Sequence, residues 1–93
     1  MKEVLLVTGS SGIAAATARM WAAENPVFVV GINKEECRSL TVELGEAGFA
    51  AADVRDQSAV RDAVVACVER FGRIHALFNV QLDQRKPWKH IGI

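Results

Sequence analysis

Short apolar runs alternate with longer amphipathic stretches along most of the chain. An apolar run bounded by turn residues is typical of a buried strand, whereas apolar positions at i, i+3, i+4 and i+7 are typical of a helix. We therefore expect strands over residues 3–8, 27–32, 49–54 and 74–80. Helices are expected over residues 12–24, 34–44 and between Asp56, as N-cap, and Gly72. This alternation predicts βαβ units with right-handed crossovers, so we assign the chain to the α/β class with a parallel sheet.

Each expected helix carries an apolar stripe that should face the sheet. In the first helix the stripe comprises Ile13, Ala16, Thr17, Met20 and either Trp21 or Ala23. In the second it comprises Cys37, Leu40, Thr41 and Leu44, and in the third Val60, Ala63, Val64, Cys67, Val68 and Phe71. Asn25-Pro26 should stop the first helix, and Gly45 or Gly48 should end the second.

The stretch from Val4 to Ala14 has a special order: an aliphatic run, then Thr8-Gly9, two serines, Gly12 and an alanine-rich segment. We interpret it as a buried strand, a tight glycine turn and the first turn of a helix. The N-terminus of a helix presents unpaired N–H groups and favours negative charge. This turn lies at the carboxyl end of the first strand, where open parallel sheets bind ligands, so the stretch predicts a phosphate site.

Composition narrows the class of protein. The 93 residues, 51% hydrophobic and 24% charged, are typical of one small soluble globular domain. Because 11 basic residues balance 11 acidic ones, no overall charge favours nucleic acid or an anionic membrane as partner. No apolar run approaches the length of about 18 residues needed to span a bilayer, and the N-terminus does not resemble a signal peptide. Cys37 and Cys67 are expected to be buried free thiols, which favours a cytoplasmic location.

Three motifs then resemble the short-chain dehydrogenase/reductase family over residues 1 to about 80. They are the run from Thr8 to Ile13, the pair Asp53-Val54 after the third strand, and the run from Leu77 to Val80. They occur in the family's order and at similar separations. The resemblance implies an NAD(P)-binding, Rossmann-like three-layer fold with the strand order 3-2-1-4, here about four strands and three helices.

The resemblance also implies NAD or NADP as the cofactor. By matching position, the pyrophosphate and adenosine ribose would be surrounded by Gly9, Ser10, Ser11, Gly12 and Ile13. Asp53 would bond the adenine amino group with the Val54 backbone alongside, and Asn79 would lie near the adenine-side ribose. Each residue also has a plainer interpretation: Asp53 and Asn79 as turn residues, the serines as N-caps. His75 is expected to be structural rather than catalytic.

The chain departs from the family pattern at several points. Two residues, rather than the usual three, separate Gly9 from Gly12, and Ala14 takes the place of the third glycine. Residues 31–33, Gly-Ile-Asn, supply neither the acidic residue typical of NAD enzymes nor the basic one typical of NADP enzymes. The cofactor preference is therefore open. The sequence contains no tyrosine, so the family's Tyr-x-x-x-Lys pair is missing and we assign no catalytic residue and no metal ligand.

We expect residues 1–80 to form a dinucleotide-binding half-domain and residues 81–93 an irregular, disordered tail. The function that follows is the NAD(P)-binding portion of an alcohol or carbonyl oxidoreductase, inactive alone because the half with the Ser and the Tyr-x-x-x-Lys is absent. One alternative is a non-enzymatic module that binds a dinucleotide or self-associates through the exposed edge of the fourth strand. Another is a non-functional frameshift remnant.

Overall fold

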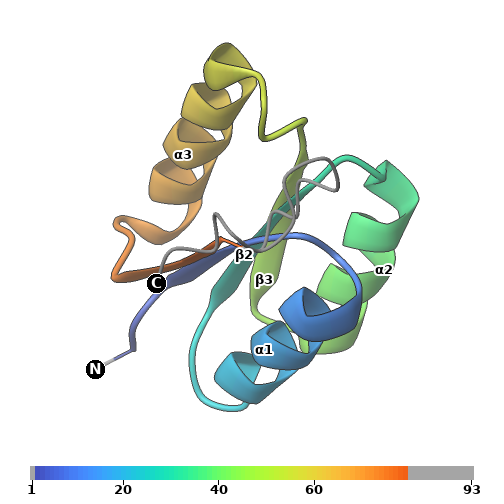
Figure 1. Ribbon diagram of the computed structural model, residues 1–93. Coiled ribbons are helices and arrows are strands. Elements are labelled where there is room, and N and C mark those ends of the chain that lie inside the picture. The colour runs from blue at the N-terminus through green and yellow to red at the C-terminus, as the bar shows by residue number, and fades with distance from the viewer. Residues whose placement is uncertain (1, 80–93) are drawn as a thin grey trace, which may run out of the picture.

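The computed structural model describes residues 2–79, which form one parallel sheet with helices on both faces (Figure 1). The strands are β1 (Leu5–Thr8), β2 (Val27–Gly31), β3 (Ala47–Ala51) and β4 (Ala76–Asn79). The helices are α1 (Gly12–Ala22), α2 (Lys34–Leu44) and α3 (Gln57–Phe71). The strand order is β3-β2-β1-β4 with every pairing parallel, which confirms the predicted α/β class and order. The predictions for Val80 and for residues 81–93 fall outside the described residues.

The three layers follow from alternation along the strands. Leu5 and Val7 of β1 face α1 and α2, whereas Val4 and Leu6 face α3. Successive strand residues point to opposite faces of a sheet, so a strand covered on both sides is apolar at every position. In Figure 1 the sheet lies between α3 on one side and α1 with α2 on the other. No helix of the described residues is long and apolar enough to cross a membrane.

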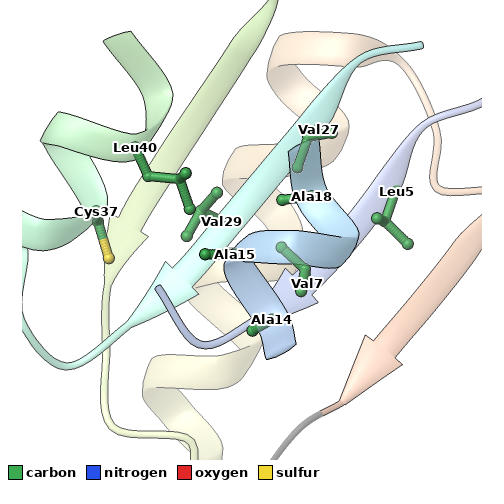
Figure 2. Packing of buried hydrophobic residues seen from close by; sticks show 9 residues of the cluster. All are labelled: Leu5, Val7, Ala14, Ala15, Ala18, Val27, Val29, Cys37 and Leu40. Carbon is green, nitrogen blue, oxygen red and sulfur yellow. The ribbon is translucent and has the colours of Figure 1, made fainter. Parts of the chain in front are cut away.

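The predicted inner face of α1 was wrong for Ile13 and Met20, which are 65% and 81% exposed. The buried residues of this helix are Ala14, Ala15 and Ala18 (Figure 2), and Trp21 of the predicted stripe packs partly buried against the same cluster. These three alanines also follow helical spacing, so the nearly continuous run of small and apolar residues allowed either face. The close packing of α1 on the sheet selects the face with the three alanines, because only small side chains fit where the helix lies directly on β1 and β2.

Helix ends were predicted better than strand ends. Asp56 caps α3 by accepting from the N–H groups of Ser58 and Ala59, and Gly72 closes that helix as predicted. Gly45 ends α2, with its N–H donating to the Thr41 carbonyl. The third strand was predicted over residues 49–54, but pairing with β2 begins at Ala47 and ends at Ala51. Gly48 therefore lies inside β3, where an added Cβ would come within 3.2 Å of Phe28.

The outer side of α3 and the edge strand β4 are only partly covered. Ala63 and Cys67 are buried against the sheet as predicted, but Val64 and Val68 of the same stripe are more than a third exposed. Leu77 of β4 is 66% exposed, and β4 pairs with β1 alone among the described strands. Self-association through this edge stays a prediction. Cys37 and Cys67 are buried free thiols, and burial raises the pKa of both, which keeps them protonated and unreactive.

Candidate functional site

The turn after β1 has the backbone that its glycines suggest. Gly9 has φ +114° and Gly12 has φ +59°, a region that L side chains rarely adopt. The N–H of Gly9 donates to the carbonyl of Val30 at 2.7 Å, which fixes the turn to the end of β2. A Cβ on Gly9 would lie 2.9 Å from the Cβ of Ala14, closer than real Cβ atoms come. The turn therefore approaches α1 so closely that a residue with a Cβ does not fit at position 9 without a shift.

The N-terminus of α1 has no side-chain cap. Its N-cap residue, Ser11, is extended and makes no capping hydrogen bond, and the first turn holds no acidic residue. The other two described helices differ, since Asn33 caps α2 and Asp56 caps α3. A helix start with uncapped N–H groups and a favourable dipole is suited to an external anion.

Beside this turn lies an open hollow of about 470 Å³ between α1 and α2. Its lining residues are Ser10, Ser11, Gly12, Ala15, Arg19, Asn33, Glu35, Glu36, Ser39, Leu40 and Glu43. Two contacts cross it: Ser10 Oγ donates to Glu36 Oε1 at 2.7 Å, and Arg19 is held by both oxygens of Glu43. Three of the predicted cofactor-binding residues thus meet in one place with acidic residues of α2.

A second hollow of about 150 Å³ lies between α3 and the strands β1, β2 and β4. It brings Val54 and Asn79 together with Thr8, whose Oγ1 donates to Asn79 Oδ1 at 2.7 Å. Thr8 and Asn79 are direct partners in the register of β1 and β4. The structure therefore gathers the predicted site residues at the carboxyl edge of the sheet, divided between two hollows on either side of β1. Gly9, Ile13 and Asp53 line neither hollow, and the side chain of Ile13 is largely exposed.

Asp53 follows β3 and is bound by its neighbour Arg55. Its Oδ1 accepts from the Arg55 backbone N–H and Nε, and its Oδ2 accepts from Nη2 at 2.9 Å. The guanidinium bonds, followed by the backbone bond, lower the pKa of Asp53 to about 2. Each carboxylate oxygen offers two lone pairs, so Oδ2 retains capacity for one further donor such as an amino group.

We expect Arg55→Ala to raise the pKa of Asp53 toward its ordinary 3.8, but not fully, because the Arg55 backbone N–H still donates to it. An NMR titration of the Asp53 carboxyl carbon measures this directly. Because folding lowers this pKa, its small contribution to stability is present at neutral pH and is lost as the pH falls below 3.8 toward 2. Arg73→Ala is the matched control, since Arg73 precedes β4 at the opposite edge of the sheet. An unchanged pKa in Arg55→Ala would contradict the pairing.

His75 lies away from this edge. Its Nδ1 accepts from the Val4 N–H at 2.8 Å, at the amino ends of β1 and β4. This agrees with the structural role predicted from the sequence. Among residues 2–79 no group of three His, Cys, Asp or Glu side chains is placed to hold a metal ion.

The sequence did not identify Asn33 and Glu36 as part of the site. Glu36 lies outside the apolar stripe of Cys37, Leu40, Thr41 and Leu44, and Asn33 stands in the sequence only as an uncharged residue after the second strand. The capping pattern offered one signal, since an Asn before a helix whose third residue is Glu resembles a capping box, and Asn33 accepts from the Glu36 N–H. The bond between Glu36 and Ser10 joins residues 26 positions apart, so no local pattern indicates it.

Comparison with known proteins decides the family. The model of the short chain dehydrogenase family matches residues 2–81. The chain belongs to the short-chain dehydrogenase family. A 2,5-dichloro-2,5-cyclohexadiene-1,4-diol dehydrogenase of Sphingobium indicum is 35% identical over 83 residues, covering 84% of this chain and 33% of that enzyme. An A-factor type gamma-butyrolactone 1'-reductase of Streptomyces virginiae is 42% identical over 84 residues, covering 83% of this chain and 32% of the reductase.

Solved short-chain dehydrogenase structures have the same architecture. A variant of actinorhodin polyketide ketoreductase with NADPH aligns with a TM-score of 0.83 and 35% identity, over 88% of this chain and 34% of that one. A short-chain type dehydrogenase/reductase from Mycobacterium ulcerans gives a TM-score of 0.80 at 27% identity, over 87% and 33%. The present chain thus spans about a third of the length of its short-chain dehydrogenase relatives. It corresponds to their N-terminal, Rossmann-like part.

Proposed function

We propose that this chain binds a nicotinamide adenine dinucleotide through the pyrophosphate and adenosine half of the cofactor. The observation that carries the proposal is the uncapped N-terminus of α1, presented by a glycine turn at the carboxyl end of β1. This position lies between β2 and β4, where the strand order reverses direction, and open parallel sheets bind ligands at such a point. Membership of a family with an NADPH-bound neighbour supports the same ligand.

Different residues of the chain would bind different parts of the cofactor. Backbone N–H groups of the turn from Ser10 to Ile13 would bind the pyrophosphate oxygens, aided by the dipole of α1, while Gly9, whose own N–H donates to Val30, would give the turn its shape. Ser10 and Ser11 would lie beside the adenosine ribose, because both line the hollow between α1 and α2, which we call the ribose hollow from here on. After the carboxyl end of β3, Asp53 would accept from the adenine amino group with Val54 alongside, and at the end of β4 Asn79 would stay near the ribose, held by Thr8.

The family reaction is hydride transfer between the cofactor and an alcohol or carbonyl, and the bound nicotinamide supplies the hydride chemistry. Our proposal for this chain is limited to binding, because the sequence holds no tyrosine to serve as the family's proton donor. Neither cysteine is a substitute, since both are buried with a raised pKa.

Gly12→Asp tests the proposal. The backbone of Gly12, at φ +59°, is one that Asp and Asn adopt more readily than other residues, and no atom lies within 4 Å of an added Cβ. The fold should therefore survive, while the new carboxylate would repel the pyrophosphate at the helix start. We expect the affinity for NAD⁺, measured by isothermal titration calorimetry, to fall by about tenfold or more.

Gly12→Asn is the matched control, because it has the same shape and backbone preference without the charge. It should lose much less affinity than Gly12→Asp. Equal affinities in all three forms would contradict binding at this turn, as would failure of the unmodified chain to bind NAD⁺ or NADP⁺ at millimolar concentration. Oxidation of alcohols by the purified chain with either cofactor would contradict the restriction to binding.

A further inference from the structure

The choice between NAD and NADP rests on charge near the ribose of the adenosine half. Dinucleotide-binding sheets place an acidic residue near the end of the second strand to bind the ribose hydroxyls, or a basic residue to bind the 2'-phosphate. Here β2 ends in Gly31, and an added Cβ would come within 2.8 Å of Cys37 Sγ and 3.4 Å of Ser10 Oγ. A side chain has no room at Gly31, and the next residue, Ile32, is exposed but uncharged, so a charged group must come from another element.

Glu36 supplies such a group from the first turn of α2. Its Oε1 accepts from Ser10 Oγ at 2.7 Å, and Ser10 belongs to the glycine turn itself. Glu36, Ser10 and Ser11 all line the ribose hollow. The carboxylate is thus fixed beside the turn that would hold the pyrophosphate. Since one carboxylate carries about four lone-pair sites, it can accept from Ser10 and from ribose hydroxyls together.

The other charges around the hollow do not neutralise Glu36. Three carboxylates line it, from Glu35, Glu36 and Glu43, against the single guanidinium of Arg19. Arg19 is held by Glu43 through two hydrogen bonds of 2.6 and 3.2 Å. Arg38 pairs with Glu35 at 3.4 Å, and Lys34 begins α2 without lining the hollow. The hollow therefore presents net negative charge.

We propose that Glu36 takes the place of the missing strand-end carboxylate, accepting hydrogen bonds from the adenosine ribose hydroxyls and repelling a 2'-phosphate. The chain then selects NAD over NADP. This inference rests on the proposed dinucleotide site and adds its specificity. Discrimination of this kind depends on a repulsive group as much as on an attractive one.

The experiment measures binding of NAD⁺ and NADP⁺ separately to the chain and to Glu36→Gln by isothermal titration calorimetry. We expect the unmodified chain to bind NAD⁺ about tenfold or more tightly than NADP⁺. Glu36→Gln keeps an amide oxygen to accept from Ser10 but loses the charge that strengthens the bonds to the ribose hydroxyls, so its NAD⁺ affinity should fall by about threefold. Its NADP⁺ affinity should rise until the affinities of this variant for NAD⁺ and for NADP⁺ differ by about threefold or less. Glu35→Gln is the matched control, because it removes a carboxylate of the same hollow that does not contact Ser10, and it should preserve more of the discrimination.

The outcomes separate this inference from the function on which it rests. Equal binding of the two cofactors, or tighter binding of NADP⁺, overturns the role of Glu36 and leaves dinucleotide binding intact. If Glu36→Gln still prefers NAD⁺ and Glu35→Gln does not, the repulsion comes from Glu35. This result also overturns the proposed role of Glu36. Binding of neither cofactor overturns both the specificity and the proposed function.

Discussion

Gly9→Ala should lower the free energy of unfolding by about 2–6 kcal/mol at 25 °C. The φ of +114° imposes a strain of about 1–3 kcal/mol on a residue with a Cβ. The new Cβ would also lie 2.9 Å from that of Ala14, and such overpacking costs about 1–3 kcal/mol more. The sum, about 2–6 kcal/mol, is a large fraction of the roughly 5–15 kcal/mol that stabilises a domain. Urea denaturation followed by circular dichroism measures the loss.

A second substitution separates the two causes. Ala14→Gly removes the Cβ that Gly9→Ala would strike, at a cost of up to about 1 kcal/mol in helix propensity. In the double variant the overpacking should disappear while the backbone strain stays, so the two substitutions should be less destabilising together than their sum. Gly12→Ala is the control for strain alone, since it has φ +59° and open space around its Cβ. If Gly9→Ala matched the original chain in stability, the close approach of the turn to α1 would be wrong.

The strands and helices could be predicted from the sequence because two independent signals agreed, whereas the strand order followed from the resemblance to the short-chain dehydrogenase/reductase family. Apolar runs marked the strands, and capping residues such as Asp56 and Gly72 marked helix ends. Where only one signal was present, the prediction was less exact. Strand β3 contains the weakly apolar run from Ala47 to Ala51, with Gly48 inside it, so its start was placed two residues late. Local patterns thus determine which elements form more firmly than where they end.

The packing of α1 shows a different limit. Its sequence offers apolar residues on nearly every side, so helical periodicity alone does not select the buried face. Distance to the sheet selects it, and that distance is set by Gly9 and Ala14, which belong to different elements. Met20 lies exposed, whereas the neighbouring Trp21 packs partly buried against the same cluster as the three alanines. Ala14, which stands where the family has its third glycine, is therefore part of how this helix packs.

The candidate site also has one feature that the sequence predicts and others that it does not. The glycine turn was predictable because positive φ at Gly9 and Gly12 follows from the residue type and its place after a strand. The bonds between Ser10 and Glu36 and between Thr8 and Asn79 were not, because they join residues 26 and 71 positions apart. They arise only after parallel pairing has brought the carboxyl ends of the strands together. Residue type thus predicts the turn, and topology supplies its neighbours.

Gly31→Ala should destabilise the fold by about 1–3 kcal/mol, because its new Cβ would lie 2.8 Å from Cys37 Sγ in a fully buried position. Cys37→Ala removes that sulfur, so the two substitutions together should cost less than their sum, as urea denaturation of both single variants and the double variant would measure. Gly48→Ala in β3 is the comparison, and it should cost less, since its new Cβ would meet the Arg70 side chain at 3.0 Å and the Phe28 ring at 3.2 Å rather than a sulfur at 2.8 Å. If the double variant lost as much free energy of unfolding as the two single variants at positions 31 and 37 together, the close approach of α2 to the end of β2 would be contradicted. That approach excludes a carboxylate from position 31 and brings α2 near enough for Glu36 to reach Ser10.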